Sequence, residues 1–273
     1  MKHALLTLLL LISVTLSAKT IRVLAIGNSF SEDAVEQYLY ELCAENGDQL
    51  IIGNAYRGGQ GLESHWKVVV NQEPAFSYRK IVKGKKTTSE KRTLTSIVID
   101  EEWDIITFQQ VSQDAGLYRT YEPFQTNLIR YVKAIATNKN PRIGFHMTWA
   151  YPQYSKHGGF KSYNNDQMTM YNAICDAVRQ NLEHHPDIHF VIPSGTAVQN
   201  ARATYLGDHL NRDGFHLDLG IGRYIAACTW AEALTGKSCV GKKFRPAKVT
   251  AKDALTAQKA AHAAVKTPYK LAE

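Results

Sequence analysis

Apolar and polar positions alternate between two patterns along this chain. Short apolar runs bounded by Gly, Asn or Pro predict buried strands. Between them, apolar residues recur three and four positions apart, which predicts helices with one face turned toward a core. The predicted strands span residues 21–26, 49–55, 103–110, 142–148 and 188–193. The predicted helices span residues 31–46, 124–137, 167–182, 194–202, 219–234 and 251–265.

This regular alternation predicts the α/β fold class. We expect residues 19–273 to form a single doubly wound, three-layer α/β/α domain with a five-stranded, mainly parallel sheet. Residues 77–95 interrupt the alternation and predict a hairpin insertion, with Lys83 and Gly84 near its turn. The tail at about 240–273 is rich in Ala and Lys, and its pattern leaves open whether it packs on the domain.

The first eighteen residues have a different character. Met1–Ala18 has one lysine near its start, an unbroken apolar run, and small residues at its end. This is the layout of a secretory signal peptide, with cleavage expected after Ser17 or Ala18. The apolar part is shorter than the about twenty residues that span a bilayer. We therefore expect an exported protein, periplasmic or extracellular, without a membrane span.

The charge balance adds little to this picture. The chain has 32 Lys and Arg residues against 25 Asp and Glu residues, a formal net charge of +7. Its denser basic runs, Lys80–Arg92 and Lys237–Lys248, lack the interleaved aromatic residues of nucleic-acid sites. We interpret both runs as solvated surface and expect no nucleic-acid partner.

Cysteine spacing argues against a zinc site. The four cysteines, Cys43, Cys175, Cys228 and Cys239, form no CxxC pair. Helical patterns around the first three predict buried thiols. In an oxidising compartment, a disulfide between Cys228 and Cys239 is the first that we expect.

The candidate chemistry begins where the first strand ends. Gly27, Asn28 and Ser29 break the apolar run, and Ser31 with the acidic residues after it predicts a helix start. A serine there has its hydroxyl at the carboxyl edge of the sheet, where open α/β folds bind ligands. All three residues are also common in ordinary turns, so this segment alone does not establish a nucleophile.

A second polar pair lies near the end of the chain. Asp213 and His216 are three residues apart, just before a predicted helix. A carboxylate can fix the tautomer of a neighbouring imidazole, whose other nitrogen then accepts a proton from a serine. Such pairs are frequent by chance, and only their combination with Ser29 suggests a hydrolase.

Together with a glycine-rich segment, these residues resemble the SGNH hydrolases of the GDSL-like group. That family has Gly-Asp/Asn-Ser after the first strand, Asn-Ala-x-x-x-Gly after the second, and Asp-x-x-His near the C-terminus. The matching segments here are Gly27–Ser29, Asn54–Gly59 and Asp213–His216. The third family block, Gly-x-Asn-Asp, is altered to Val111-Ser112-Gln113-Asp114.

The resemblance implies a flavodoxin-like fold and an ester hydrolase that needs no metal or cofactor. It implies a catalytic set of Ser29, Asp213 and His216. Backbone N–H groups of Ser29 and Gly59 would stabilise the oxyanion, together with a glutamine amide. Because of the altered block, that glutamine is either Gln110 or Gln113.

The substrate class follows less directly. The resemblance to this family, together with export and loops rich in Tyr, Trp and Asn, favours acetyl or other short acyl esters of a carbohydrate. Two alternatives remain open at this point: a lipid or lysophospholipid esterase, and a carbohydrate-binding protein on a degenerate hydrolase fold.

Overall fold

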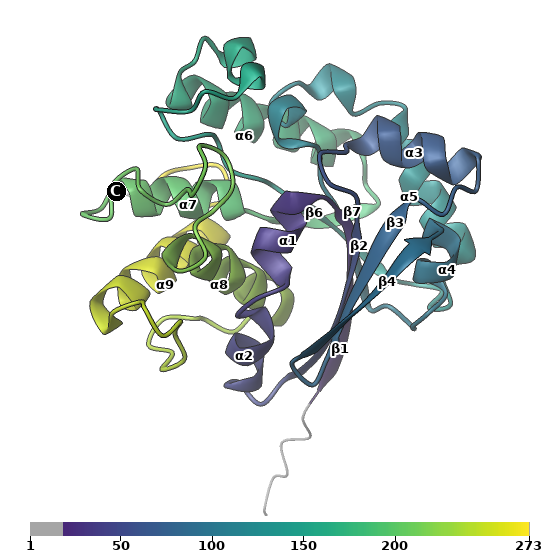
Figure 1. Ribbon diagram of the computed structural model, residues 1–273, viewed down its shortest axis with the longest axis horizontal. Coiled ribbons are helices and arrows are strands. Elements are labelled where there is room, and N and C mark those ends of the chain that lie inside the picture. Colours follow the sequence, from purple (N-terminus) through teal and green to yellow (C-terminus); the bar gives the residue numbers. More distant parts are fainter. Residues whose placement is uncertain (1–18, 273) are drawn as a thin grey trace, which may run out of the picture.

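The fold is described from a computed structural model, which describes residues 19–272. The predicted signal peptide lies outside the described residues. Helices cover both faces of a central sheet (Figure 1). Five parallel strands form most of that sheet, in the order β2-β1-β5-β6-β7. They are β1 (Thr20–Gly27), β2 (Gln49–Tyr56), β5 (Ile105–Phe108), β6 (Arg142–His146) and β7 (Ile188–Ile192).

The predicted α/β architecture is confirmed, but the predicted number of strands is wrong. The hairpin is not a separate insertion, because its strands β3 (Phe76–Val82) and β4 (Lys85–Arg92) extend the sheet to seven strands. Strand β3 pairs antiparallel with β2 and buries Tyr78 and Ile81. Strand β4 is exposed, and its charged side chains suit a sheet edge that must not pair further.

Two groups of helices cover the sheet. Figure 1 shows α1, α2, α8 and α9 on one face and α3, α4 and α5 on the other. The first group spans α1 (Ser29–Val35), α2 (Leu39–Ala44), α8 (Ile221–Thr235) and α9 (Ala251–Lys266). The second spans α3 (Leu62–Val70), α4 (Leu94–Val98) and α5 (Phe124–Ile135). The remaining helices are α6 (Gln167–His184), α7 (Ser194–Arg202) and the short 3-10 turns η1 (Ser112–Asp114), η2 (Tyr118–Thr120) and η3 (Gly158–Tyr163).

The first helix differs from its prediction in both start and length. Its N-cap is Asn28, not Ser31, because the Asn28 side chain accepts a hydrogen bond from the N–H of Phe30. Ser29 is therefore the first helical residue. The predicted continuous helix breaks into α1 and α2, and Tyr38 between them has a left-handed backbone conformation, φ 69°.

The C-terminal tail packs on the domain. Helix α9 lies against α7 and α8, and it buries a stripe of alanines that includes Ala257 and Ala261. Further along, the N–H of Ala272 donates to the side chain of Asn200, 2.9 Å away. The tail that the sequence left unplaced is therefore part of the core.

The expected disulfide is absent from the described structure, where all four cysteines are buried free thiols. Cys239 and Cys228 are neighbours, but the Cys239 thiol donates to the backbone carbonyl of Cys228, 3.3 Å away. Burial raises the pKa of the Cys228 thiol well above its usual range, which keeps it protonated.

Candidate functional site

Three predicted residues from opposite ends of the chain meet at the carboxyl edge of the parallel strands. The Oγ atom of Ser29 lies 2.8 Å from Nε2 of His216. Nδ1 of His216 lies 2.7 Å from Oδ2 of Asp213. Because the carboxylate can only accept, Nδ1 carries the proton and Nε2 is free to accept from the Ser29 hydroxyl. The arrangement can therefore move a proton from the serine to the histidine.

The Asp213 carboxylate is oriented by its own loop. Its Oδ1 atom accepts from the backbone N–H groups of Phe215 and His216, at 3.3 and 2.8 Å. Partial burial opposes the charged form, but the hydrogen bonds with His216 outweigh it and lower the pKa of Asp213. The carboxylate thus stays charged at neutral pH and holds the imidazole in one orientation.

A buried carboxylate on α1 fixes the position of this loop. Asp33 is one turn beyond Ser29 and is fully buried. It contacts the guanidinium of Arg212 at 3.0 and 3.1 Å and that of Arg223 at 2.6 Å. It also accepts from the N–H of Leu217 at 2.9 Å. Asp33 therefore connects the helix of Ser29, the loop of His216 and helix α8.

Asn28, beside the candidate nucleophile, organises the neighbouring glycine-rich loop. Its Oδ1 atom accepts from the N–H of Phe30 and from Nε2 of Gln109, both at 2.9 Å. Its Nδ2 atom donates to the backbone carbonyl of Gln60, also at 2.9 Å. The N–H of Arg57 in turn donates to the carbonyl of Gly27. These bonds hold residues 57–61 against the turn that carries Ser29.

A chain of buried side chains supports Asn28 from behind. Oε1 of Gln109 lies 3.1 Å from Nδ1 of His146, and Nε2 of His146 lies 3.0 Å from Oγ of Ser194. Burial lowers the pKa of His146 to about 3, so the ring is neutral, with one donor and one acceptor nitrogen. The bond to Gln109 assigns the proton to Nδ1. The amides of Asn28 and Gln109 and the ring of His146 are then each held in a single orientation by this row of hydrogen bonds.

Asn54, the first residue of the segment Asn54–Gly59, has a structural role. Its Oδ1 atom accepts from the Ser31 hydroxyl at 2.9 Å, and its Nδ2 atom donates to Glu36 at 2.8 Å. Asn54 therefore fastens the end of β2 to α1, next to the turn that carries Ser29.

Of the groups expected to bind an oxyanion, some have no hydrogen-bond acceptor within residues 19–272, whereas one is already engaged. Ser29 and Gly59 have backbone N–H groups that find no acceptor among residues 19–272. Gly59 has φ +67°, a conformation that favours glycine. The Gln113 side chain likewise makes no hydrogen bond within this part of the chain, whereas Nε2 of Gln110 donates to both the carbonyl and the hydroxyl of Thr120. Of the two glutamines, only Gln113 has an unengaged amide.

Aromatic side chains line the histidine side of the site. Phe30 stacks on Trp149 with ring centroids 4.3 Å apart, and the Trp149 indole donates to the carbonyl of Phe215. Phe215 lies against His216 at 4.0 Å and against His157 at 5.0 Å. Burial and the neighbouring His216 lower the pKa of His157. His157, which no sequence motif singled out, is thus part of the site wall.

Several supporting residues could not be identified from sequence. Asp33 reads as an ordinary acidic residue in a first helical turn, and Arg212 and Arg223 as solvated charges. Their contacts with one another join positions up to 190 residues apart in the chain. Gln109 could be noticed only weakly in the sequence, because it directly follows a buried strand.

No group of three potential metal ligands occurs in the described part of the chain, and no helix there is long and apolar enough to cross a membrane.

Comparison with solved structures shows relatives at two distances. A DUF4886 family protein from Bacteroides uniformis is 46% identical, with a TM-score of 0.91 over 93% of this chain and 98% of that one. A mutant of Axe2, an acetyl-xylooligosaccharide esterase from Geobacillus stearothermophilus, is 13% identical, with a TM-score of 0.54 over 83% and 99% of the two chains. A proposed SGNH hydrolase from Slackia heliotrinireducens is 17% identical, with a TM-score of 0.51 over 79% and 99%.

The two distant likenesses show a shared fold. A comparison with curated proteins found no match. The profile of a family described as a domain of unknown function, DUF4886, matches residues 22–264. Because this match covers most of the sequence, the chain belongs to the DUF4886 family.

Proposed function

We propose that this protein is a serine ester hydrolase that removes acetyl or other short acyl groups, with a carbohydrate as the alcohol part. The observation that carries the proposal is the hydrogen-bonded array of Ser29, His216 and Asp213, with contacts of 2.8 and 2.7 Å. Nucleophile, base and orienting carboxylate are the parts that acyl transfer to a serine requires.

The proposed reaction has two halves. In the first, Ser29 Oγ attacks the ester carbonyl while His216 Nε2 takes the hydroxyl proton. The tetrahedral intermediate collapses, His216 returns this proton to the departing alcohol, and an acyl-enzyme remains. In the second half, water attacks the acyl-enzyme with His216 again as base, and the free acid leaves as the serine regains its proton.

The oxyanion of each intermediate needs donors fixed in advance. We assign the N–H groups of Ser29 and Gly59 and the side-chain amide of Gln113, since none of them has another acceptor in the described chain. A single donor of this kind typically contributes about 3 kcal/mol to transition-state stabilisation. Asn28 holds the Ser29 turn and the Gly59 loop together, so that two donors come from one rigid unit.

Two points support a carbohydrate ester over a lipid ester. The pocket beside Gly59 is lined mainly by polar side chains, which are poorly suited to a long acyl chain. One of the fold neighbours is an acetyl-xylooligosaccharide esterase. The fold likeness by itself does not carry function, and the proposal depends on the residue geometry.

The test is acetate release from acetylated polysaccharides and acetylated sialic acids, with an aryl acetate as a simple reference ester. Ser29→Ala and His216→Ala should each lower kcat by at least about a thousandfold. Ser89→Ala, on the exposed strand β4, is the matched control and should leave kcat unchanged.

The outcomes separate the parts of the proposal. Near-full activity in Ser29→Ala would remove Ser29 as the nucleophile. Hydrolysis of the aryl acetate alone would keep the esterase and discard the carbohydrate. Rates that rise from acetyl to octanoyl esters would favour a lipid substrate, and sugar binding without any hydrolysis would favour a binding protein.

A further inference from the structure

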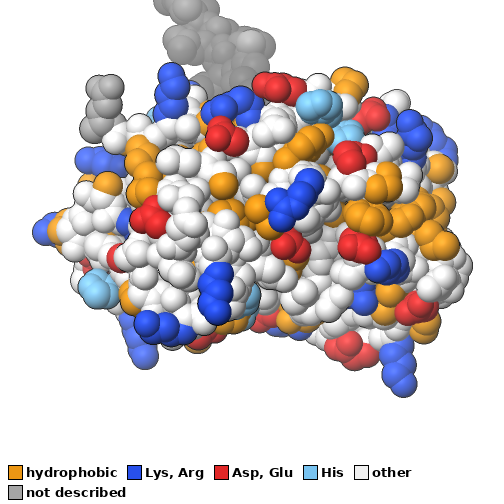
Figure 2. Space-filling view, turned by 90° about the horizontal axis from the view of Figure 1, so that it is seen from above, with side chains coloured by type: hydrophobic (Ala, Val, Ile, Leu, Met, Phe, Trp, Pro, Cys, Tyr) orange, Lys and Arg blue, Asp and Glu red, His pale blue; other side chains and the backbone are white. Residues whose placement is uncertain are grey.

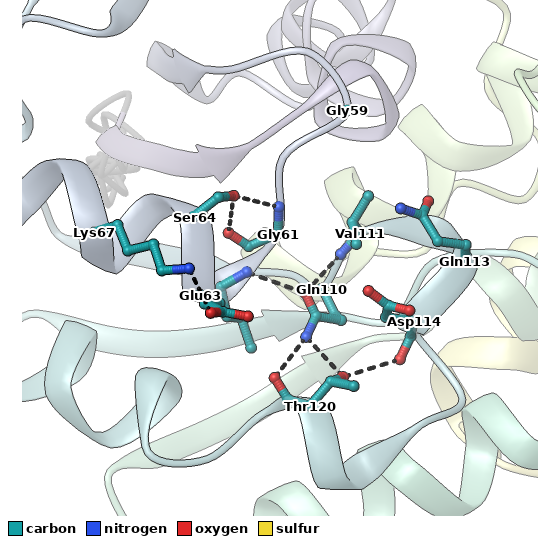
Figure 3. A pocket seen from close by; sticks show the side chains of 11 residues that line it. Gly59, Gly61, Glu63, Ser64, Lys67, Gln110, Val111, Gln113, Asp114 and Thr120 are labelled. Atoms are coloured by element: carbon teal, nitrogen blue, oxygen red, sulfur yellow. Dashed lines mark hydrogen bonds and ion pairs between the residues drawn. The ribbon is translucent and has the colours of Figure 1, made fainter. Parts of the chain in front are cut away.

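A pocket of about 260 Å³ lies next to the glycine-rich loop, residues 57–61. Its walls are the loop around Gly59 and Gly61, the first turns of α3, and the segment from Gln110 to Thr120 (Figure 3). The volume is below the roughly 300–1,000 Å³ of pockets that hold drug-sized ligands. The pocket therefore has room for one small ring and not for an extended chain.

Most polar groups of this pocket are already engaged with one another. Gln110 accepts from the N–H groups of Leu62 and Val111 and donates to Thr120. Ser64 exchanges hydrogen bonds with the backbone of Gly61, 3.0 and 2.9 Å long. Glu63 and Lys67 pair with each other at 2.6 Å on the exposed rim. These groups shape the pocket but have little free capacity to bind a ligand.

The Asp114 carboxylate differs from its neighbours. It makes no hydrogen bond or ion pair within residues 19–272, although it is only partly exposed. Figure 3 shows it pointing from η1 toward α3, while the Gln113 amide lies nearer to Gly59. Burial raises the pKa of Asp114; the charge of Arg119 opposes that shift in part, and the nearby Glu63 adds to it. Arg119 offers this carboxylate charge but no direct contact, so its hydrogen-bonding capacity is free for donors that a ligand supplies.

The chemistry of the pocket selects among ligands. A carboxylate accepts hydrogen bonds from two hydroxyl groups and repels anions such as phosphate. A long acyl chain would bury the charge without a donor. Neighbouring hydroxyl groups on one small ring fit both the size and the polarity, which describes a monosaccharide unit.

The pocket shares its glycine-rich wall with the turn that carries Ser29. Residues 57–61 are held against the Ser29 turn by the bonds from Asn28 to Gln60 and from Arg57 to Gly27. Gly59 and Gln113, the proposed oxyanion donors, both line the pocket. A group bound there therefore adjoins two of the proposed oxyanion donors.

We propose that this pocket is the subsite for a sugar ring of the substrate, and that Asp114 is the residue that recognises its hydroxyl groups. The inference rests on the proposed function, because it assigns the alcohol part of the ester to this pocket. Asp114 selects the substrate and does not take part in the bond-breaking steps.

The experiment compares kcat/KM for acetylated xylooligosaccharides and for para-nitrophenyl acetate, which has no sugar. In Asp114→Asn, the ratio of the first value to the second should fall at least about tenfold, mainly through KM, since a hydrogen bond to a charged group is lost. Asp176→Asn is the matched control. It lies on α6, where its carboxylate pairs with Arg179, and the ratio should not change.

A binding measurement tests the subsite without relying on catalysis. Xylobiose titrated into the wild-type protein should shift the NMR amide signals of Gly61, Asp114 and Thr120, and this needs no variant to fold. The same titration of Asp114→Asn should give weaker shifts.

The two proposals can fail separately. An unchanged substrate ratio in a folded Asp114→Asn, or shifts only at distant residues, would overturn the subsite while leaving the esterase intact. Xylobiose binding at Asp114 without hydrolysis of either ester would keep the subsite and overturn the proposed activity.

Discussion

At the scale of single residues, the tautomer of His216 decides what Ser29 can do. Asp213 accepts from Nδ1, so that Nε2 faces the serine hydroxyl with its lone pair. The backbone bonds to Asp213 fix the carboxylate before any substrate arrives. The imidazole therefore needs no rearrangement at the moment of proton transfer.

Asp213→Asn tests this role. The amide can keep the shape of the loop but can present an N–H to His216 and favour the wrong tautomer. We expect kcat for an aryl acetate to fall roughly 10²- to 10⁴-fold, less than in Ser29→Ala. Parallel kinetics of the two variants check this, and equal losses in both would show that Asp213 does more than orient the ring.

At the scale of elements, four segments meet behind the site. The ends of β1, β5 and β6 and the start of α7 each contribute one member of the chain from Asn28 through Gln109 and His146 to Ser194. Helix α1 supplies Asp33, which joins α8 and the 211–217 loop. The candidate site thus depends on how these elements pack and not on any one of them.

Asp33→Asn should weaken this junction. Removing one partner of a buried ion pair leaves its arginines without compensation, and the usual loss in the free energy of unfolding is about 3–5 kcal/mol. Asp187→Asn is the matched control, since its bond to Lys133 is exposed and should contribute about 1 kcal/mol or less. Urea unfolding of both variants measures the difference. A loss no larger in Asp33→Asn than in the control would contradict the proposed junction.

At the scale of the whole molecule, one face carries side chains of both charges. In Figure 2 the Lys and Arg side chains on the face shown lie among Asp and Glu side chains and do not gather in one patch. Burial of two titratable rings in the core has a larger effect on how stability depends on pH. His65 and His146 are both buried, and burial lowers the pKa of each to about 3. For His65 the charge of Arg57 adds to the shift.

These histidines predict acid sensitivity of the fold. Between pH values of about 6.5 and 3 the unfolded chain binds protons that the folded chain excludes. The free energy of unfolding should therefore fall as the pH falls through this window, by up to about 1.4 kcal/mol per pH unit for each ring.

His65→Leu separates one ring from the other. Both nitrogens of His65 lack a partner in the described structure, and the ring stacks on Phe76 at 5.5 Å, so leucine removes polar atoms and no hydrogen bond. When the pH is lowered from 7 to 4, the thermal unfolding temperature should fall less in the variant than in the wild type. His209→Leu, at an exposed position, should keep the wild-type drop. An equal drop in all three proteins would disprove the role of His65.

Local sequence predicted the five parallel strands and most of the helices, because hydrophobic period and turn residues act within a few positions, but it missed α3 and α4. It also nominated Ser29, Asp213 and His216 as candidates, because the segments that carry them resemble a known family pattern in order and spacing. The cap at Asn28 was missed because Ser31 is an equally good N-cap residue, and only the hydrogen bond from the N–H of Phe30 to the Asn28 side chain distinguishes the two.

Tertiary structure alone decided the rest. Pairing of β3 with β2 turned the hairpin into part of the sheet, packing on α7 and α8 placed the tail, and Thr120 engaged Gln110 while leaving Gln113 free. The junction at Asp33 joins residues that are remote in the chain. Such contacts depend on which surfaces meet after folding, and this is a property of the whole chain that no local pattern contains.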